Sequence, residues 1–80
     1  MSPQLPLYEQ LAELLRAKIK SGELKPGDRL PSTGMLKADG WKQGVIVSAM
    51  RILRVEGWTR GQPGQAVFVA EHPPGVTSTD

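Results

Sequence analysis

The 80-residue sequence has no cysteine and only one histidine. The absence of cysteine excludes disulfide bonds and thiolate metal sites. The single histidine stands beside two prolines near the C-terminus, and no carboxylates recur at a spacing that would bring them together. No glycine-rich phosphate loop follows an expected strand, so the sequence gives no support to a nucleotide-dependent enzyme. We therefore expect no enzyme, no cofactor and no metal site.

Long hydrophobic runs are also missing. No stretch approaches the roughly 20 apolar residues that a membrane-spanning helix needs, and the N-terminus has no hydrophobic segment of the signal-peptide kind. We expect no membrane contact and a location in the bacterial cytoplasm. A chain of 80 residues makes one small domain with one tight core.

Basic side chains are concentrated in the middle of the chain. The net charge is only +2, but all ten lysines and arginines lie between Arg16 and Arg60, where only four acidic residues are found. Ten positive charges against four negative ones give +6 for this span, which suits a polyanionic partner such as a nucleic acid. An ordinary solvated surface is the alternative interpretation of this charge.

The first third of the chain predicts a helix followed by a turn. The helix begins after Pro6 and ends near Ser21, where Gly22 can adopt a left-handed cap. Its apolar stripe consists of Leu7, Leu11, Leu14, Leu15, Ala17 and Ile19. Residues 26–28 (Pro-Gly-Asp) have the composition of a turn. We expect Leu24 and Leu30 to enter the core on either side of this turn, with a short strand before the next helix.

A short second helix is expected over residues 33–38. Ser32 or Thr33 supplies its N-cap, and Met35 and Leu36 are available to the core. A turn containing glycine then leads to a third helix. Two helices joined in this way have the sequence form of a helix-turn-helix.

The third helix and the segment after it organise the rest of the chain. The helix lies within residues 41–57, and its core face carries apolar residues at i, i+3, i+4 and i+7, namely Ile46, Ala49, Met50 and Leu53. Residues 58–60 and 66–69 form the arms of a hairpin, with Gly61, Pro63 and Gly64 at its tip. A helix followed by a two-stranded ribbon can lie in a nucleic-acid groove.

These elements predict a mainly α (α+β) fold, a winged helix-turn-helix of three helices and a β-hairpin wing. The domain covers residues 1–70. Residues 71–80 have no periodicity and are expected to form a flexible tail or linker.

Five runs of residues carry a resemblance to a known family: 7–11 (LYEQL), 24–32 (LKPGDRLPS), 49–53 (AMRIL), 56–57 (EG) and 68–70 (FVA). They resemble the winged helix-turn-helix DNA-binding domain of the GntR family of bacterial transcription regulators. The resemblance implies sequence-specific binding of a double-stranded DNA operator, usually as a dimer on an inverted repeat. It implies a repressor whose third helix enters the major groove and whose wing approaches the minor groove.

The resemblance also implies which residues contact DNA. By position these are Ser32 and Thr33 in the second helix, Lys42, Gln43, Gly44, Val45 and Val47 in the third, and Pro63, Gly64 and Gln65 in the wing. Four further basic residues can add positive charge near phosphates: Lys37, Arg51, Arg54 and Arg60. Gln43 can pair bidentately with adenine, Lys42 can reach guanine or a phosphate, and Val45 can touch a thymine methyl group.

The third helix departs from the family pattern. It opens with Lys-Gln-Gly-Val where the family has a small hydroxyl residue, an arginine and threonines, and Val47 replaces a second arginine. Val45, Val47 and Ile52 lie off the core stripe, so this helix is apolar on more than one face. Exposed apolar patches favour protein partners. The alternative function is therefore a winged-helix interaction or dimerisation module with weak or no DNA binding, and a protein partner on the apolar side of this helix.

Full-length members of the family carry a second domain after the wing, which binds an effector and dimerises. Here only residues 71–80 follow the wing. The chain is therefore expected to be either an excised DNA-binding domain or a minimal regulator. We expect no small-molecule effector, a homodimer only through the domain's own surface, and association with the nucleoid.

Overall fold

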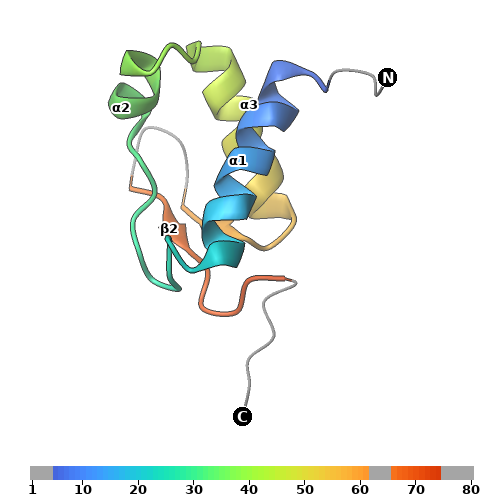
Figure 1. Cartoon of the computed structure of the whole chain (residues 1–80), viewed down its shortest axis with the longest axis vertical. Helices are drawn as coiled ribbons and strands as arrows, with labels where there is room; N and C mark the ends of the chain where they lie inside the picture. Colours follow the sequence, from blue (N-terminus) through green and yellow to red (C-terminus); the bar gives the residue numbers. More distant parts are fainter. Residues whose placement is uncertain (1–4, 62–65, 75–80) are drawn as a thin grey trace.

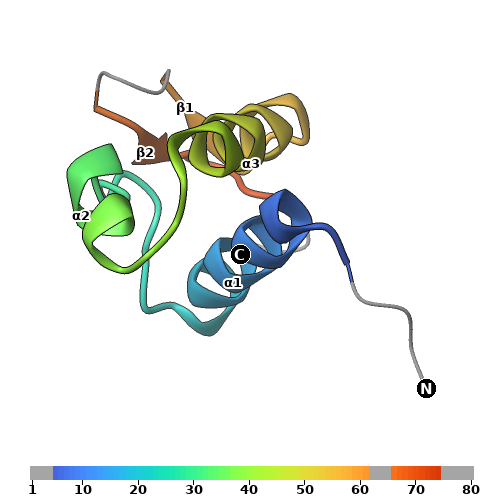
Figure 2. The same ribbon diagram turned by 90° about the horizontal axis from the view of Figure 1, so that it is seen from above.

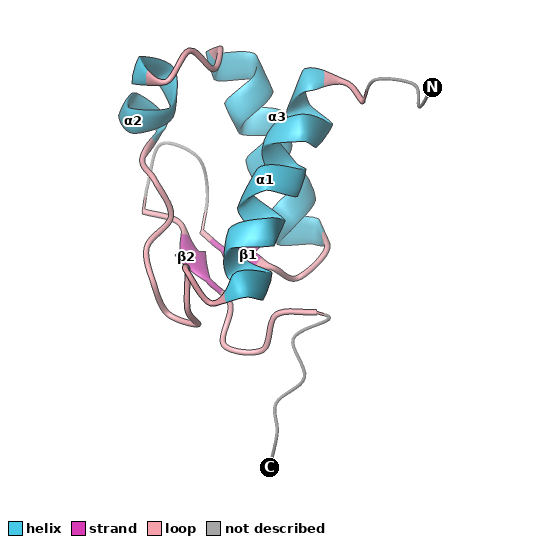
Figure 3. Cartoon of the chain, in the orientation of Figure 1, coloured by secondary structure: helices cyan, strands magenta, loops and turns pink. Residues whose placement is uncertain are grey.

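Three helices and a small antiparallel sheet make up the part of the chain that the structure, a computed structural model, describes: residues 5–61 and 66–74 (Figure 1, Figure 3). In chain order the elements are α1 (Leu7–Ser21), α2 (Thr33–Ala38), α3 (Gln43–Val55), β1 (Thr59–Arg60) and β2 (Phe68–Val69). The predicted winged-helix architecture and the order of its elements are confirmed.

Local sequence signals set the ends of the helices. Gly22 follows α1 with a left-handed φ of 88°, and its N–H donates to the Ile19 carbonyl over 3.2 Å. Ser32 precedes α2, and its Oγ accepts a hydrogen bond of 3.2 Å from the Met35 N–H. Gly57, with φ of 90°, ends the segment after α3. Each of these ends agrees with the sequence prediction.

The core lies mainly between α1 and α3, which Figure 2 shows lying next to each other. From α3 it contains the predicted stripe of Ile46, Ala49, Met50 and Leu53, all buried. From α1 it contains Leu11, Ala12, Leu15 and Ile19. Leu30, Leu36, Trp58, Val67 and Val69 complete the core, and Leu24 packs against it. Leu24 and Leu30 therefore take the positions that were expected of them.

The predicted apolar stripe of α1 is wider than the surface that is buried. Leu7 is 54% exposed and Leu14 is 45% exposed, and Ala17 is exposed as well. The reason is that the rest of the domain covers only the side of α1 that carries its buried residues. Met35 was also expected in the core but is 61% exposed, because the short α2 buries only Leu36.

The wing is shorter than the sequence suggested, because β1 and β2 have two residues each. The strands pair antiparallel, with Thr59 opposite Val69 and Arg60 opposite Phe68. A third segment adds to this sheet through a single bridge between Arg29 and Phe68, where the Leu30 N–H donates to the Val67 carbonyl over 2.8 Å. This bridge stands where a short strand was expected before the second helix, and it ties the loop before α2 to the wing.

Gly61 is required at the end of β1. Its φ is 108°, and a Cβ atom there would lie 2.5 Å from the Ala66 carbonyl oxygen. Any side chain would therefore clash with the opposite arm as well as adopt an unfavourable backbone conformation. The predicted tip residues Pro63, Gly64 and Gln65 lie outside the described residues.

An ionic network centred on Arg16 connects α1 with the segment between α3 and the wing. The Arg16 side chain, 11% exposed, lies 2.9 Å from Glu13, 3.0 Å from Glu56 and 4.0 Å from Glu9. The indole Nε1 of Trp58 donates to the same Glu56 oxygen over 3.1 Å. A guanidinium can bind several carboxylates at once, so Arg16 joins three parts of the chain.

Residues after the wing also contact the domain. Pro73 is buried, and Pro74 lies near Gly57. His72 is exposed. The division of the chain at residue 70 and a flexible tail over 71–80 stay predictions. None of the helices in the described ranges is both long enough and apolar enough to cross a membrane.

Candidate nucleic-acid interface

The outer side of α3 carries a row of exposed side chains. Gln43, Val47, Arg51 and Arg54 follow one another at i, i+4, i+8 and i+11, a spacing that places them on one face of a helix. All four are exposed, and Val47 is 37% exposed. Because the buried residues of α3 occupy the opposite side, this face is available to a partner.

The beginning of α3 is open. Lys42 is the N-cap residue, and its side chain is exposed. Gly44 is exposed too, and a Cβ atom at this position would have nothing within 4 Å. Nothing in the fold therefore requires glycine here, whereas the missing side chain lets another molecule approach the helix backbone closely.

A hydrogen bond joins α2 to the first residue of α3. The Lys37 Nζ donates to the Gln43 Oε1 over 2.8 Å. The carbonyl oxygen of an amide has two lone pairs and its NH₂ group has two donors, so Gln43 can keep this bond and still make two further ones. Lys37 thus fixes how the Gln43 amide is presented. The sequence analysis named Lys37 only for its charge, since a contact across a turn leaves no periodic signal.

The residues at the start of α2 have mainly structural contacts. Ser32 and Thr33 are half-buried, and the Ser32 hydroxyl serves as the cap of α2. Gly34 is exposed. A contact of Ser32 or Thr33 with a phosphate stays a prediction.

The turn between α2 and α3 holds the two helices in place through Trp41. The Trp41 N–H donates to the Leu36 carbonyl over 3.1 Å, and its ring packs against the core together with Val45. We expected Val45 to lie off the core stripe, and this is wrong. Trp41 approaches from the turn and extends the core toward the start of α3, which brings half of Val45 into it.

The basic residues of the interface differ in how free their charges are. Among the described residues, neither Arg51 nor Arg54 forms an ion pair. Arg60 lies 3.9 Å from Glu71, and its guanidinium stands 5.5 Å from the centre of the Phe68 ring. The two arginines of α3 are therefore better placed to meet phosphates than Arg60, whose charge is already partly compensated.

Residues 5–61 and 66–74 contain no group of three or more side chains that could hold a metal ion. Two of the predicted contact residues, Gly64 and Gln65, fall outside these ranges, so their arrangement is not described.

A family model described as bacterial regulatory proteins of the gntR family matches residues 7–69, which is more than half of the chain. The chain belongs to the GntR family. The match confirms the resemblance drawn from the five sequence runs. A domain of this GntR type is a DNA-binding domain of transcription regulation and is not an enzyme.

Individual GntR relatives agree with this assignment. The chain is 37% identical over 71 residues to the probable rhizopine catabolism regulatory protein MocR of Rhizobium meliloti, covering 88% of this chain and 14% of that protein. It is 36% identical to the mannosyl-D-glycerate transport/metabolism system repressor MngR of Escherichia coli (strain K12), covering 82% of this chain and 28% of that protein. The chain thus spans less than a third of the length of these curated relatives.

A solved structure gives the same result for the fold. YtrA from Sulfolobus acidocaldarius, a GntR-family transcription factor, superposes with a TM-score of 0.77 at 31% identity. The similar part covers 92% of this chain and 64% of that one. The winged-helix fold of this GntR domain is therefore shown by sequence and by structure.

Proposed function

We propose that this domain binds a double-stranded DNA operator sequence-specifically as part of a repressor, with the N-terminal half of α3 in the major groove and the wing at the minor groove. The observation that supports it is the exposed row of Gln43, Val47, Arg51 and Arg54 on α3. The repressor role rests on the similarity to MngR. A dimer on an inverted repeat also stays part of the proposal.

The row has the chemistry that a major-groove reader needs. An exposed glutamine can pair with the N6 and N7 atoms of adenine, and an apolar side chain such as Val47 can contact the methyl group of thymine. Lys42, at the start of the helix, can reach guanine or a phosphate. We therefore expect an operator with A·T pairs under the beginning of α3.

Phosphate contacts should supply much of the affinity. Lys37, Arg51, Arg54 and Arg60 are all exposed, and the last of these would have to leave Glu71 to take part. If about four phosphates are neutralised, the slope of log K against log salt concentration should be about −3.6. Base contacts then add the sequence preference.

Replacing Gln43 with alanine tests base reading directly. We expect the affinity for the preferred site to fall by about 1–3 kcal/mol, with the preference lost at one base pair. The melting temperature should stay nearly unchanged, because the side chain is exposed. Competition binding with operators mutated one position at a time measures this. Lost stability with unchanged binding would instead make Gln43 a structural residue.

Lys37→Ala serves as the partner variant in the same experiment. Since Lys37 holds the Gln43 amide through the 2.8 Å bond, its removal should relax the preference at the same base pair. A double-mutant cycle of the two substitutions should be non-additive. Additive effects would mean that Lys37 contributes only a general charge.

Gly44→Ala should separate stability from DNA binding. Alanine in an exposed helical position without close neighbours should raise the free energy of unfolding by about 0.5–1 kcal/mol. If the backbone of α3 comes close to the duplex, the added methyl group should lower DNA affinity at the same time. Chemical denaturation and a binding titration on one sample measure the two effects. Unchanged binding would contradict a close approach at Gly44.

One observation supports the alternative function, a protein-interaction module on the same fold. Val47 is 37% exposed and Val55 is 76% exposed on α3, which gives this helix some apolar surface. Arg51 and Arg54 stand between these valines in the sequence, and charged residues are depleted in the centre of protein interfaces. We therefore propose DNA as the partner of this face. By the same reasoning we propose the cytoplasm, at the nucleoid, as its location.

A further inference from the structure

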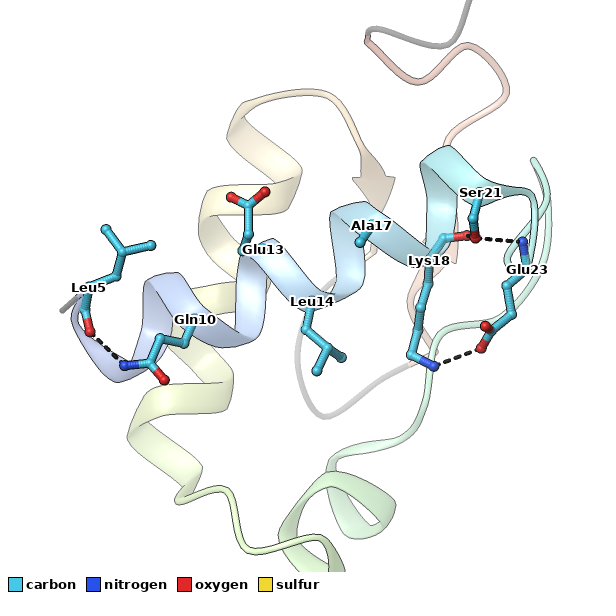
Figure 4. Close-up of a pocket in the computed structure, with 8 residues that line it drawn as sticks. All are labelled: Leu5, Gln10, Glu13, Leu14, Ala17, Lys18, Ser21 and Glu23. Carbon is cyan, nitrogen blue, oxygen red and sulfur yellow. Dashed lines mark hydrogen bonds and ion pairs between the residues drawn. The ribbon is translucent and has the colours of Figure 1, made fainter. Parts of the chain in front are cut away.

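The outer side of α1 carries a shallow groove that the core does not use (Figure 4). One row of helical positions lines it: Gln10, Glu13, Leu14, Ala17, Lys18 and Ser21. Leu14 and Ala17 form its apolar centre, with Leu14 45% exposed. Glu13 and Lys18, whose side chains are 59% and 36% exposed, lie on either side of that centre in the sequence.

The groove is complementary to a second copy of itself. In an antiparallel helix pair related by a twofold axis, if residue i faces residue j of the other copy, then j also faces i. When Leu14 faces Ala17, the same register brings Glu13 opposite Lys18. It also brings the Gln10 amide opposite the Ser21 hydroxyl. Large meets small, negative meets positive, and an amide meets a hydroxyl, each pair occurring twice.

We infer that this face of α1 is a homodimerisation surface, on which the α1 helices of two copies pack antiparallel. Leu14 of each copy packs over Ala17 of the other, where a small residue leaves room for it. The ammonium of Lys18 pairs with the carboxylate of Glu13 across the interface. A parallel arrangement would instead place like charges together, at Glu13 and again at Lys18.

The contacts within one copy allow this pairing. Lys18 lies 2.6 Å from Glu23, and an ammonium has three donors, so a second carboxylate can be bound without losing the first. Glu13 contacts Arg16 at 2.9 Å, and its exposed side chain has a second oxygen available. No residue of the exposed row on α3 lines the groove, so dimerisation leaves that row free.

The dimer should be weak and reversible. A single helix face buries less than the roughly 1,200 Å² of a standard stable interface. We therefore expect a monomer at low concentration and a dimer in concentrated solution. Sedimentation equilibrium of the 80-residue chain over a concentration series should show an average mass rising from 8.7 kDa toward twice that value. A chain that stays monomeric at every concentration would overturn the inference.

Leu14→Glu tests the apolar centre of the groove. It should weaken dimerisation by about tenfold or more, because both copies lose a leucine contact and gain a buried charge. Val55→Glu is the matched control, since it places the same charge at an exposed valine on α3, outside the groove. Dimerisation that survives Leu14→Glu, or that Val55→Glu weakens as much, would overturn the inference.

Charge reversal tests the register. Glu13→Lys and Lys18→Glu should each be monomeric alone, because each homodimer would contain two pairs of like charge. An equal mixture of the two variants should recover a heterodimer, in which both cross-pairs are attractive. Thermal melts verify that each variant is folded, and no DNA is present, so the outcome is independent of operator binding. Failure to recover a dimer in the mixture would contradict the antiparallel register.

Discussion

Replacing Val47 with glutamate should abolish specific DNA binding. Val47 lies in the middle of the exposed row on α3, between Gln43 and Arg51. A carboxylate there would face base-edge acceptors and phosphates, and the apolar contact with a thymine methyl group would be lost. The expected loss is about 3 kcal/mol, or about a hundredfold in affinity. A binding titration against the selected operator, with a thermal melt of the same sample, measures it.

Val55→Glu is the control for this substitution. It introduces the same charge on the same helix, but at the C-terminal residue of α3, where the side chain is 76% exposed. We expect it to change DNA affinity only a few-fold through long-range repulsion. Equal losses for both variants would mean that net charge, and not the position of Val47, decides binding. If Val47→Glu leaves DNA binding intact but disperses a protein complex, the alternative function applies.

Replacing Arg16 with alanine should cost about 2 kcal/mol of stability. The guanidinium is only 11% exposed and contacts Glu9, Glu13 and Glu56, so its removal leaves three carboxylates near one another without a cation. It also releases the Glu56 oxygen that accepts from Trp58. For a domain of this size the melting temperature should fall by about 8–16 °C.

Arg54→Ala provides the comparison for Arg16. Arg54 is exposed on α3 and forms no ion pair within the described residues, so its removal should change the free energy of unfolding by less than about 0.5 kcal/mol. Calorimetric or denaturant unfolding of both variants gives the difference. Equal stability of Arg16→Ala and Arg54→Ala would show that the network around Arg16 does not stabilise the fold.

The helices of this domain could be predicted because their ends are written locally. Gly22, Ser32 and Gly57 act within a few residues of the backbone groups that they cap. The core stripe of α3 was equally readable, since its residues repeat with the period of a helix. Such signals need no knowledge of the rest of the chain.

The width of the buried surface could not be predicted in the same way. Periodicity shows that Leu14 belongs to an apolar side of α1, but not that the domain would leave this side uncovered. Trp41 gave the opposite error, since its approach from the turn brought Val45 into the core. In both cases the outcome depends on the position of a second element, which one helix does not encode.

Long-range polar contacts were beyond the sequence for a similar reason. Arg16 and Glu56 are far apart in the chain, and a charged residue has many partners of opposite sign to choose from. The contact of Lys37 with Gln43 depends on how the turn orients α2 against α3. The resemblance to GntR proteins predicted which surface to examine, while the structure supplied the contact that presents Gln43.

Selection of random duplex DNA by this domain, followed by titration of the selected site over a series of salt concentrations, tests operator binding most directly. We expect one enriched motif with A·T pairs at the positions read by α3. Its log K should fall with log salt concentration with a slope of about −3.6. No enriched sequence and no salt-dependent retention would contradict DNA reading by α3 and support the protein-interaction module.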